Sequence, residues 1–116
     1  MYPEDLPPGR HLTALGADEP GKQELAPEVL LSARLIVDDA ALVATHGALA
    51  NAGLPASTAA ASLGAVIRGE AIARSHHREL TVYAPVGMPW QDLALSWSAF
   101  RRADAAGTGA TLDLLS

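Results

Sequence analysis

Two short apolar runs, separated by a segment long enough for one helix, constrain the fold of this chain more than any other feature. The first run covers residues 11–15 and stops at a glycine, and the second covers residues 34–37 and stops at two aspartates. Uninterrupted apolar runs are typical of strands buried on both faces, as in a parallel sheet. Parallel strands need a crossover, and the roughly 18 intervening residues can hold a helix over 27–33, where a proline occupies the first turn.

Two further helices are expected after the second strand, because alanine dominates this part of the chain and favours helix. Asp39 is expected to cap a helix that ends near His46. A second helix is expected to begin at Ser57 or Thr58 and to end near Arg68.

The last third of the chain contains a predicted strand and a strongly patterned helix. Polar and apolar residues alternate over 79–83, which indicates a third strand, and again over 110–114, which indicates a fourth strand or an extended tail. Between them, Pro89 begins a helix in which large apolar residues recur at three- and four-residue spacing, and we expect this stripe to face the core. The stripe consists of Trp90, Leu93, Trp97 and Phe100.

This order of elements predicts an α/β fold of three layers with a mostly parallel sheet of about four strands and right-handed crossovers. No internal repeat or low-complexity linker divides the 116 residues, so a single domain over 1–116 is expected.

Composition excludes several classes of function. The chain has no cysteine, which excludes a disulfide framework, a thiol nucleophile and a thiolate metal site, and no metal site of another kind is expected. The formal net charge of −5 argues against nucleic acid as a partner. Residues 40–67 carry no Asp, Glu, Lys or Arg, but they are mostly alanine interrupted by polar residues, so we predict no membrane span. The acidic start lacks the features of a secretory signal, and a cytoplasmic location is expected.

Ligands of open parallel sheets bind beyond the carboxyl ends of the strands, and that rule selects three places in this chain. These are the loops that begin at Gly16, at Asp38 and at Ala84. The first is the richest, because Asp18 and Lys22 place a carboxylate and an ammonium four residues apart on a loop shaped by glycine and proline. An aspartate at the mouth of a cleft can transfer a proton, and a lysine can hold an anionic group. Asp38 and Asp39 are instead expected to serve as a strand end and a helix cap.

Two longer stretches carry a family resemblance. The segment Gly-Arg-His-Leu-Thr-Ala-Leu-Gly-Ala-Asp-Glu-Pro-Gly-Lys-Gln-Glu-Leu over 9–25, followed by Ala-Arg-Leu-Ile-Val-Asp-Asp over 33–39, resembles the ornithine cyclodeaminase/mu-crystallin family. Leu-Thr-Val-Tyr-Ala-Pro-Val-Gly-Met-Pro-Trp-Gln-Asp-Leu-Ala over 80–94 is similar to the second signature of that family, in the same order. The resemblance runs from about residue 6 to about residue 114 and corresponds to the carboxyl-terminal part of a family member.

The resemblance implies a fold, a cofactor and a chemistry. It implies the carboxyl-terminal portion of a Rossmann domain that binds NAD or NADP, and action on a small amino acid or a cyclic imino acid, by deaminating cyclisation of ornithine, imine reduction or amino-acid dehydrogenation. It also implies a role for six residues. Asp18 matches the catalytic aspartate, Leu15, Gly16 and Ala17 lie where backbone meets the nicotinamide, Lys22 matches a cofactor-contacting lysine, and Val86 matches a residue that touches the substrate.

The chain also departs from the family pattern. Pro85 stands where many members place a cofactor-contacting serine, and a proline offers neither a hydroxyl nor an N–H. A glycine-rich turn of the G-x-G-x-x-G type is absent from the sequence, and nothing in it corresponds to the amino-terminal substrate domain of the family. Two hypotheses follow: a part of such an enzyme that works with a separate amino-terminal half or as a homodimer, or a non-catalytic nucleotide-binding or protein-interaction module derived from that fold.

Overall fold

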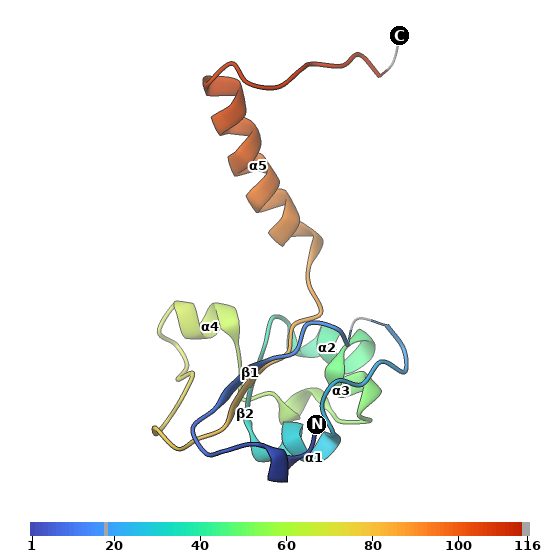
Figure 1. Cartoon of the computed structure of the whole chain (residues 1–116), viewed down its shortest axis with the longest axis vertical. Helices are drawn as coiled ribbons and strands as arrows, with labels where there is room; N and C mark the ends of the chain where they lie inside the picture. Colours follow the sequence, from blue (N-terminus) through green and yellow to red (C-terminus); the bar gives the residue numbers. More distant parts are fainter. Residues whose placement is uncertain (18, 115–116) are drawn as a thin grey trace.

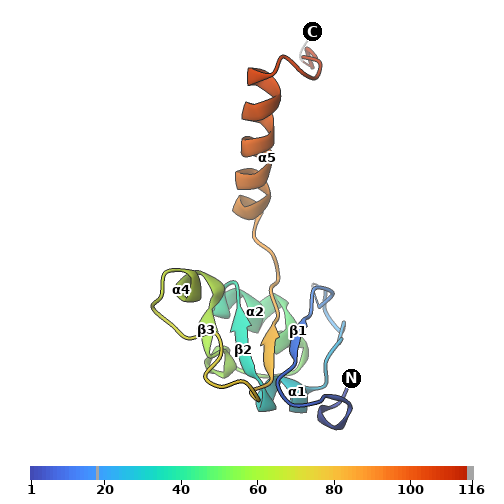
Figure 2. The same cartoon turned by 60° about the vertical axis from the view of Figure 1, so that its left-hand side comes forward.

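The computed structural model describes residues 1–17 and 19–114, and its centre is one parallel sheet. The strands lie in the order β1-β4-β2-β3, and every pair of neighbours is parallel (Figure 2). The predicted α/β class with a sheet of four strands is therefore confirmed. The strands are β1 (His11–Thr13), β2 (Arg34–Val37), β3 (Ala61–Ser62) and β4 (Thr81–Tyr83).

Helices lie on both faces of this sheet, which gives three layers. One face is covered by α1 (Pro27–Ser32), α2 (Ala40–His46) and α3 (Ala48–Asn51), and α4 (Leu63–Ile67) lies beside the other face. The longest helix, α5 (Pro89–Ala105), follows β4. Two short 3-10 turns complete the list, η1 (Pro3–Asp5) and η2 (Ala56–Thr58).

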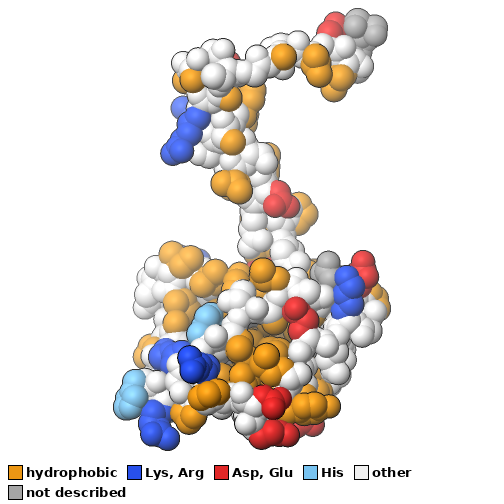
Figure 3. Space-filling model, viewed as in Figure 1, with side chains coloured by type: hydrophobic (Ala, Val, Ile, Leu, Met, Phe, Trp, Pro, Cys, Tyr) orange, Lys and Arg blue, Asp and Glu red, His pale blue; other side chains and the backbone are white. Residues whose placement is uncertain are grey.

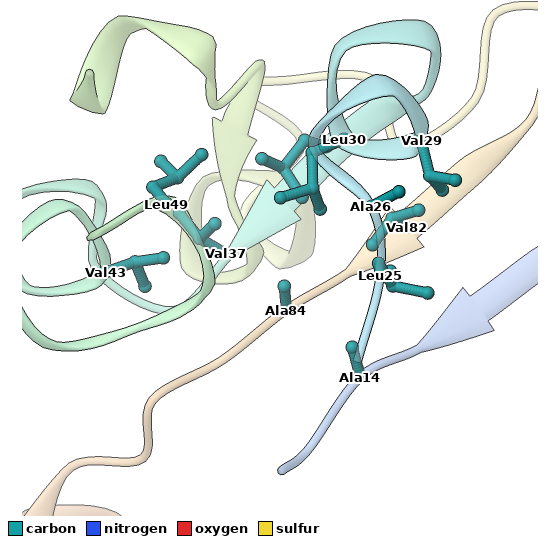
Figure 4. Packing of buried hydrophobic residues seen from close by; sticks show 11 residues of the cluster. Ala14, Leu25, Ala26, Val29, Leu30, Val37, Val43, Leu49, Val82 and Ala84 are labelled. Atoms are coloured by element: carbon teal, nitrogen blue, oxygen red, sulfur yellow. The ribbon is translucent and has the colours of Figure 1, made fainter. Parts of the chain in front are cut away.

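The core lies between the sheet and the helices α1 to α3 (Figure 4). Alternate residues of a strand point to one face, and here Leu35, Val37 and Val82 point toward the helices. They pack against Val29 and Leu30 of α1 and against single residues of α2 and α3, all fully buried. These last two are Val43 and Leu49. Aliphatic side chains and alanines thus form the whole of this small core, and none of the five aromatic residues belongs to it.

The sequence predicts several of these elements correctly. The strands β1 and β2, the crossover helix α1 between them and the strand β4 form where the sequence patterns place them. Asp39 caps α2 as expected, because its Oδ1 accepts a hydrogen bond from the backbone N–H of Leu42 at 2.9 Å. Short-range residue patterns were sufficient to predict these local structures.

The helix expected over 57–68 is wrong. This segment forms η2, then the two-residue strand β3, and then α4, which is capped by Ser62 and not by Ser57 or Thr58. The backbone N–H of Ala60 donates to the carbonyl of Leu35 at 2.8 Å, so the open edge of β2 draws the alanine-rich segment into the sheet. Tertiary hydrogen bonding here overrides a local helix preference. The strand that the sequence did not predict is therefore β3, and residues 110–114 form a tail without strand pairing.

The orientation expected for the apolar stripe is also wrong. Helix α5 leaves the body of the molecule after β4 and projects away from it, which makes the molecule 57 Å long and only 31 × 25 Å across (Figure 1). No residue of α5 is buried, and Trp90, Leu93, Trp97 and Phe100 are between 57% and 65% exposed. The periodicity identified a helix with one apolar face, but no element of the described chain covers that face. Among the helices of residues 1–17 and 19–114, none is long and apolar enough to cross a membrane.

Candidate functional site

The loops selected by the sequence lie at one edge of the sheet, because all the strands run in the same direction. Strands β1 and β4 are neighbours, with Thr13 opposite Tyr83, so the loops that follow them begin side by side. The backbone N–H of Ala14 donates to the carbonyl of Tyr83 at 2.9 Å, and that of Ala84 donates to the carbonyl of Ile36 at 3.0 Å. The loop that contains Leu15 and the turn that contains Val86 therefore start from the same edge, from which α5 also rises (Figures 1 and 2).

Asp38 holds the turn after β4 in place. Its carboxylate accepts from the backbone N–H of Val86 at 3.2 and 3.1 Å and from that of Gly87 at 2.7 Å. Its Oδ1 also accepts from the N–H of Asp39 at 2.9 Å. The sequence correctly placed Asp38 at the end of a strand, but it gave no sign of this second function, which joins β2 to residues 48 positions further along.

The loop after β1 is anchored by small buried residues and by one carboxylate. Ala14 and Ala17 are buried, whereas Leu15 between them is 67% exposed. The N–H of Gly16 donates to Oε2 of Glu24 at 2.7 Å. A Cβ on residue 16 would come within 2.9 Å of Oε1 of the same Glu24, so a larger residue there would push this carboxylate aside and disturb the hydrogen bond.

The continuation of this loop is held by Asn51, the last residue of α3. The Oδ1 atom of Asn51 accepts from the N–H of Gly21 at 3.0 Å. Its Nδ2 donates to the carbonyls of Glu19 and Lys22, at 2.9 and 2.8 Å. Nothing in the sequence around Asn51 indicates this function, because its partners lie about 30 residues earlier in the chain.

Lys22 is exposed on this loop and forms an ion pair with Glu19, whose Oε2 lies 3.1 Å from its Nζ. Both side chains are well exposed, so this pair contributes little to stability. The backbone that carries Lys22 is anchored by Asn51, whose Nδ2 donates to its carbonyl.

The turn after β4 packs closely on the start of α3. Val86 is half-buried, and a Cβ on the buried Gly47 would clash with Cγ2 of Val86 and come within 3.1 Å of Cα of Val43. The φ of Gly47 is −127°, which any residue can adopt, so only this contact requires glycine. Gly47 is thus a site residue that the sequence analysis missed.

Tyr83, the last residue of β4, stands beside this edge on the face opposite the core. Burial raises the pKa of its phenol above its ordinary value, and the negative charge of Asp38 raises it further. Tyr83 also lines a hollow of about 310 Å³ between the sheet and α4. Three of the polar side chains that line it are paired with one another: His11 Nδ1 lies 2.8 Å from Thr81 Oγ1, which also accepts from Arg74 at 2.9 Å. The hollow is therefore less suited to a charged ligand than the carboxyl edge.

The structure places the predicted site residues on two adjoining loops. Leu15, Gly16, Ala17 and Lys22 lie on the loop after β1, and Val86 lies on the turn after β4. Asp18, predicted as the catalytic residue, lies outside the described residues. The described ranges hold no group of three or more His, Cys, Asp or Glu side chains that could bind a metal ion.

A family model for the ornithine cyclodeaminase/mu-crystallin family matches residues 2–107. The chain belongs to the ornithine cyclodeaminase/mu-crystallin family. The resemblance drawn from the two sequence stretches is confirmed.

Known relatives within the ornithine cyclodeaminase/mu-crystallin family include dehydrogenases and reductases. The alanine dehydrogenase of Archaeoglobus fulgidus is 33% identical over 109 residues, which cover 90% of this chain and 34% of the relative. The iminosuccinate reductase of Paracoccus denitrificans is 31% identical over 107 residues, which cover 90% of this chain and 33% of the relative. The chain spans about a third of the length of these curated relatives.

The fold agrees with that of a solved family member. The structure of an archaeal alanine dehydrogenase dimer with bound NAD superposes with a TM-score of 0.86 at 30% sequence identity. The matched region covers 99% of this chain and 37% of the alanine dehydrogenase chain. The predicted Rossmann-like fold is therefore confirmed.

Proposed function

We propose that this chain forms the nicotinamide side of an NAD- or NADP-dependent active site that acts on a small amino acid or a cyclic imino acid. The observation that supports this most directly is the pair of adjoining loops at the carboxyl edge, each anchored by a side chain from elsewhere in the fold. Asp38 anchors the turn that contains Val86, and Asn51 anchors the loop that contains Lys22. Fixed backbone at this edge is what ligand binding in an open parallel sheet requires.

The residues present fit one end of a dinucleotide. Ala14, Gly16, Ala17 and Ala84 bring backbone close to the edge with little side chain in the way, which suits contact with a flat ring. Lys22 adds a positive charge on an exposed loop, suited to an anionic group of the cofactor. The sequence has no glycine-rich turn for the pyrophosphate. The complete site thus needs further chain, from a separate amino-terminal half or from a longer protein.

The chemistry divides between cofactor and protein. Bound nicotinamide supplies hydride transfer to or from the carbon that bears the nitrogen. In this proposal Asp18 transfers the accompanying proton, since it comes directly after Ala17 on the loop at which the ring would lie. Val86 limits the space for the substrate side chain, because Gly47 and Asp38 fix its position. The cytoplasm, where NAD and NADP are available, is the proposed location.

Reconstitution tests the proposal. The purified chain is mixed with the amino-terminal part of the Archaeoglobus fulgidus alanine dehydrogenase, and NADH binding is followed by fluorescence, with turnover of alanine, ornithine, proline and cyclic imines. We expect the mixture to bind NADH at least about tenfold more tightly than either part alone, because each part holds a portion of the contacts. No gain in binding and no turnover would remove the support for the enzymatic hypothesis.

Variants separate the roles of individual residues. Asp18→Asn is expected to abolish turnover and to leave NADH binding unchanged, whereas Lys22→Met is expected to weaken binding. Asn51→Ala is expected to weaken binding through loss of the loop anchor, and Asn51→Asp to do so at least as strongly, because a carboxylate cannot donate to the carbonyls of Glu19 and Lys22. Glu28→Gln, an exposed change on α1, is the matched control and should alter neither quantity.

A further inference from the structure

We propose that Arg74 is a positioning residue for the candidate site, because its side chain fixes the register of β1 against β4. Arg74 lies in the segment between α4 and β4, and Figure 3 shows Arg and His side chains gathered on that side of the body. Arg78 in the same segment is exposed, whereas Arg74 is half-buried and its guanidinium contacts the sheet. The inference rests on the proposed function, since the loops that follow β1 and β4 form the site which that function requires.

The guanidinium of Arg74 joins the starts of both strands. Its Nη1 donates to the carbonyls of Gly9 and Glu79, at 3.0 and 2.8 Å, and more weakly to that of His77 at 3.4 Å. Its Nη2 donates to the carbonyl of Arg10 at 3.2 Å and to Oγ1 of Thr81 at 2.9 Å. One planar group with several fixed donors thus holds together two strands that begin 70 positions apart in the sequence.

The backbone around the guanidinium is tightly packed. The N–H of Gly9 donates to the carbonyl of Arg78 at 2.9 Å. Gly9 has a φ of +79°, and a Cβ at this position would clash with the carbonyl oxygen of His77. Thr81 is 4% exposed, and its Oγ1 also lies 2.8 Å from Nδ1 of His11, the residue opposite it in the sheet. The contacts of Arg74 therefore include the first paired residues of the two strands.

The hydrophobic pattern alone leaves one alternative register open. The ladder between β1 and β4 has only three residue pairs. A shift by one residue would turn Leu12 away from the core, but a shift by two residues would keep every side chain on its own face. The second shift would move the loop after β1 by about 6.6 Å relative to Val86. Arg74 opposes this shift, because after such a displacement its guanidinium cannot reach both strands within hydrogen-bonding distance.

The register set at the starts of the strands determines which groups are neighbours at their carboxyl ends. Thr13 lies opposite Tyr83, and the N–H of Ala14 donates to the carbonyl of Tyr83 at 2.9 Å. These contacts fix the position of Gly16 relative to Val86, between which the nicotinamide and the substrate lie in the proposed function. A displacement of about 1 Å at a reacting centre can lower a rate about 100-fold, so the register affects the site although Arg74 contacts neither loop.

Two arginine variants of the full chain test this assignment through hydrogen exchange measured by NMR. Arg74→Gln and Arg78→Gln each remove one positive charge from the same segment, but the contact of Arg78 with the start of β1 is made by its backbone carbonyl. We expect Arg74→Gln to accelerate exchange of the Ala14 amide at least about tenfold relative to the Val43 amide, and Arg78→Gln less than about twofold. The comparison with Val43, a core residue of α2, removes the effect of a general loss of stability.

NADH binding by the reconstituted mixture gives the functional measurement. Arg74→Gln should weaken binding at least about fivefold under conditions in which circular dichroism shows the chain to be folded, and Arg78→Gln less than about twofold. Arg74→Lys should not restore binding, because one ammonium group cannot reach both strands. If Arg74→Gln does not fold, Thr81→Val takes its place, since it removes a single hydroxyl, and Thr81→Ser, which keeps the hydroxyl, is its control.

The outcomes separate this inference from the proposed function. The inference is overturned if the Ala14 amide exchanges at the same rate in the two arginine variants, or if NADH binding is unchanged although that amide exchanges faster. Recovery of binding in Arg74→Lys would also overturn it, because a charge alone would then be sufficient. If the parent mixture does not bind NADH, the proposed function fails, and the exchange of Ala14 still decides whether Arg74 sets the register.

Discussion

Replacing Asp38 removes the acceptor that holds the turn after β4, and the structure gives the expected loss of stability. The carboxylate accepts from three backbone N–H groups, at 2.7 Å for Gly87, 2.9 Å for Asp39 and 3.1 Å for the nearer contact to Val86. A hydrogen bond to a charged group contributes about 1.5–3 kcal/mol, and the half-exposed position reduces this because water can replace the lost acceptor. We expect Asp38→Ala to lower the free energy of unfolding by about 2–3 kcal/mol, and Asp38→Asn, which keeps one acceptor oxygen, by about 1–2 kcal/mol.

Urea denaturation followed by far-UV circular dichroism measures this loss. With a slope of about 1.5 kcal/mol per molar urea, the Asp38→Ala midpoint should fall by about 1.5 M without a change of slope. Glu28→Gln, like Asp38→Ala, removes one negative charge, but at an exposed position, and should keep the midpoint within about 0.3 M of that of the parent chain. Hydrogen exchange gives a local measure, because the amides of Val86 and Gly87 should exchange at least about tenfold faster in both Asp38 variants. Unchanged midpoints and unchanged exchange at these two amides would refute the account of how the turn is fixed.

Two further predictions concern the same edge of the sheet. Gly47→Ala should destabilise the fold by about 1–3 kcal/mol, because the added methyl clashes with Val86. Val86→Ala in the same chain should recover part of that loss, which a double-mutant cycle by urea denaturation measures. Strictly additive effects of the two substitutions would contradict the contact between these residues. Tyr83 should ionise at higher pH than an ordinary tyrosine. Ultraviolet absorbance follows this ionisation, and the loss of the transition in Tyr83→Phe assigns it. Asp38→Asn should lower the pKa of Tyr83 but not return it to the ordinary value, since burial is the larger cause of the shift. Because the folded pKa of this acid is raised, the unfolded chain loses its proton first, and stability should fall as pH rises above about 10, less so in Tyr83→Phe.

The parts of the fold that were predictable depend on short-range patterns. The apolar run over 34–37 is buried because both faces of β2 are covered, and the capping contact of Asp39 spans only three residues. The helix expected over 57–68 failed because the competing interaction, the edge of β2, lies more than 20 residues away. Local propensity could not show that a strand edge would be free to pair with this alanine-rich segment.

The candidate site divides in the same way. The loops that begin at Gly16 and Ala84 lie at one edge of the sheet as predicted, because both follow the carboxyl ends of parallel strands. The side chains that anchor those loops were not found. Asp38 reaches residues 48 and 49 positions ahead, and Asn51 reaches residues 29 to 32 positions behind. Their chemistry is visible in the sequence, but their partners depend on the order of the strands.

The stripe on α5 shows a further limit of periodicity. Apolar residues at helical spacing establish that one face of a helix requires a partner, but the same spacing arises whether that partner is the core of the same chain, another part of a longer protein or a second copy. In the structure, the connection and direction of α5 exclude the first of these, because no described element of the chain covers the stripe. Pro85 and Gly87 lie in the link between β4 and α5, the link leaves the carboxyl edge, and the helix then extends beyond the reach of α1 to α4. The edge that carries the candidate site therefore also carries the helix that presents the stripe, so whatever covers the stripe lies next to the entrance of the site. Because Asp38 holds the turn from which α5 departs, Asp38→Ala should loosen both the position of Val86 and the direction of α5.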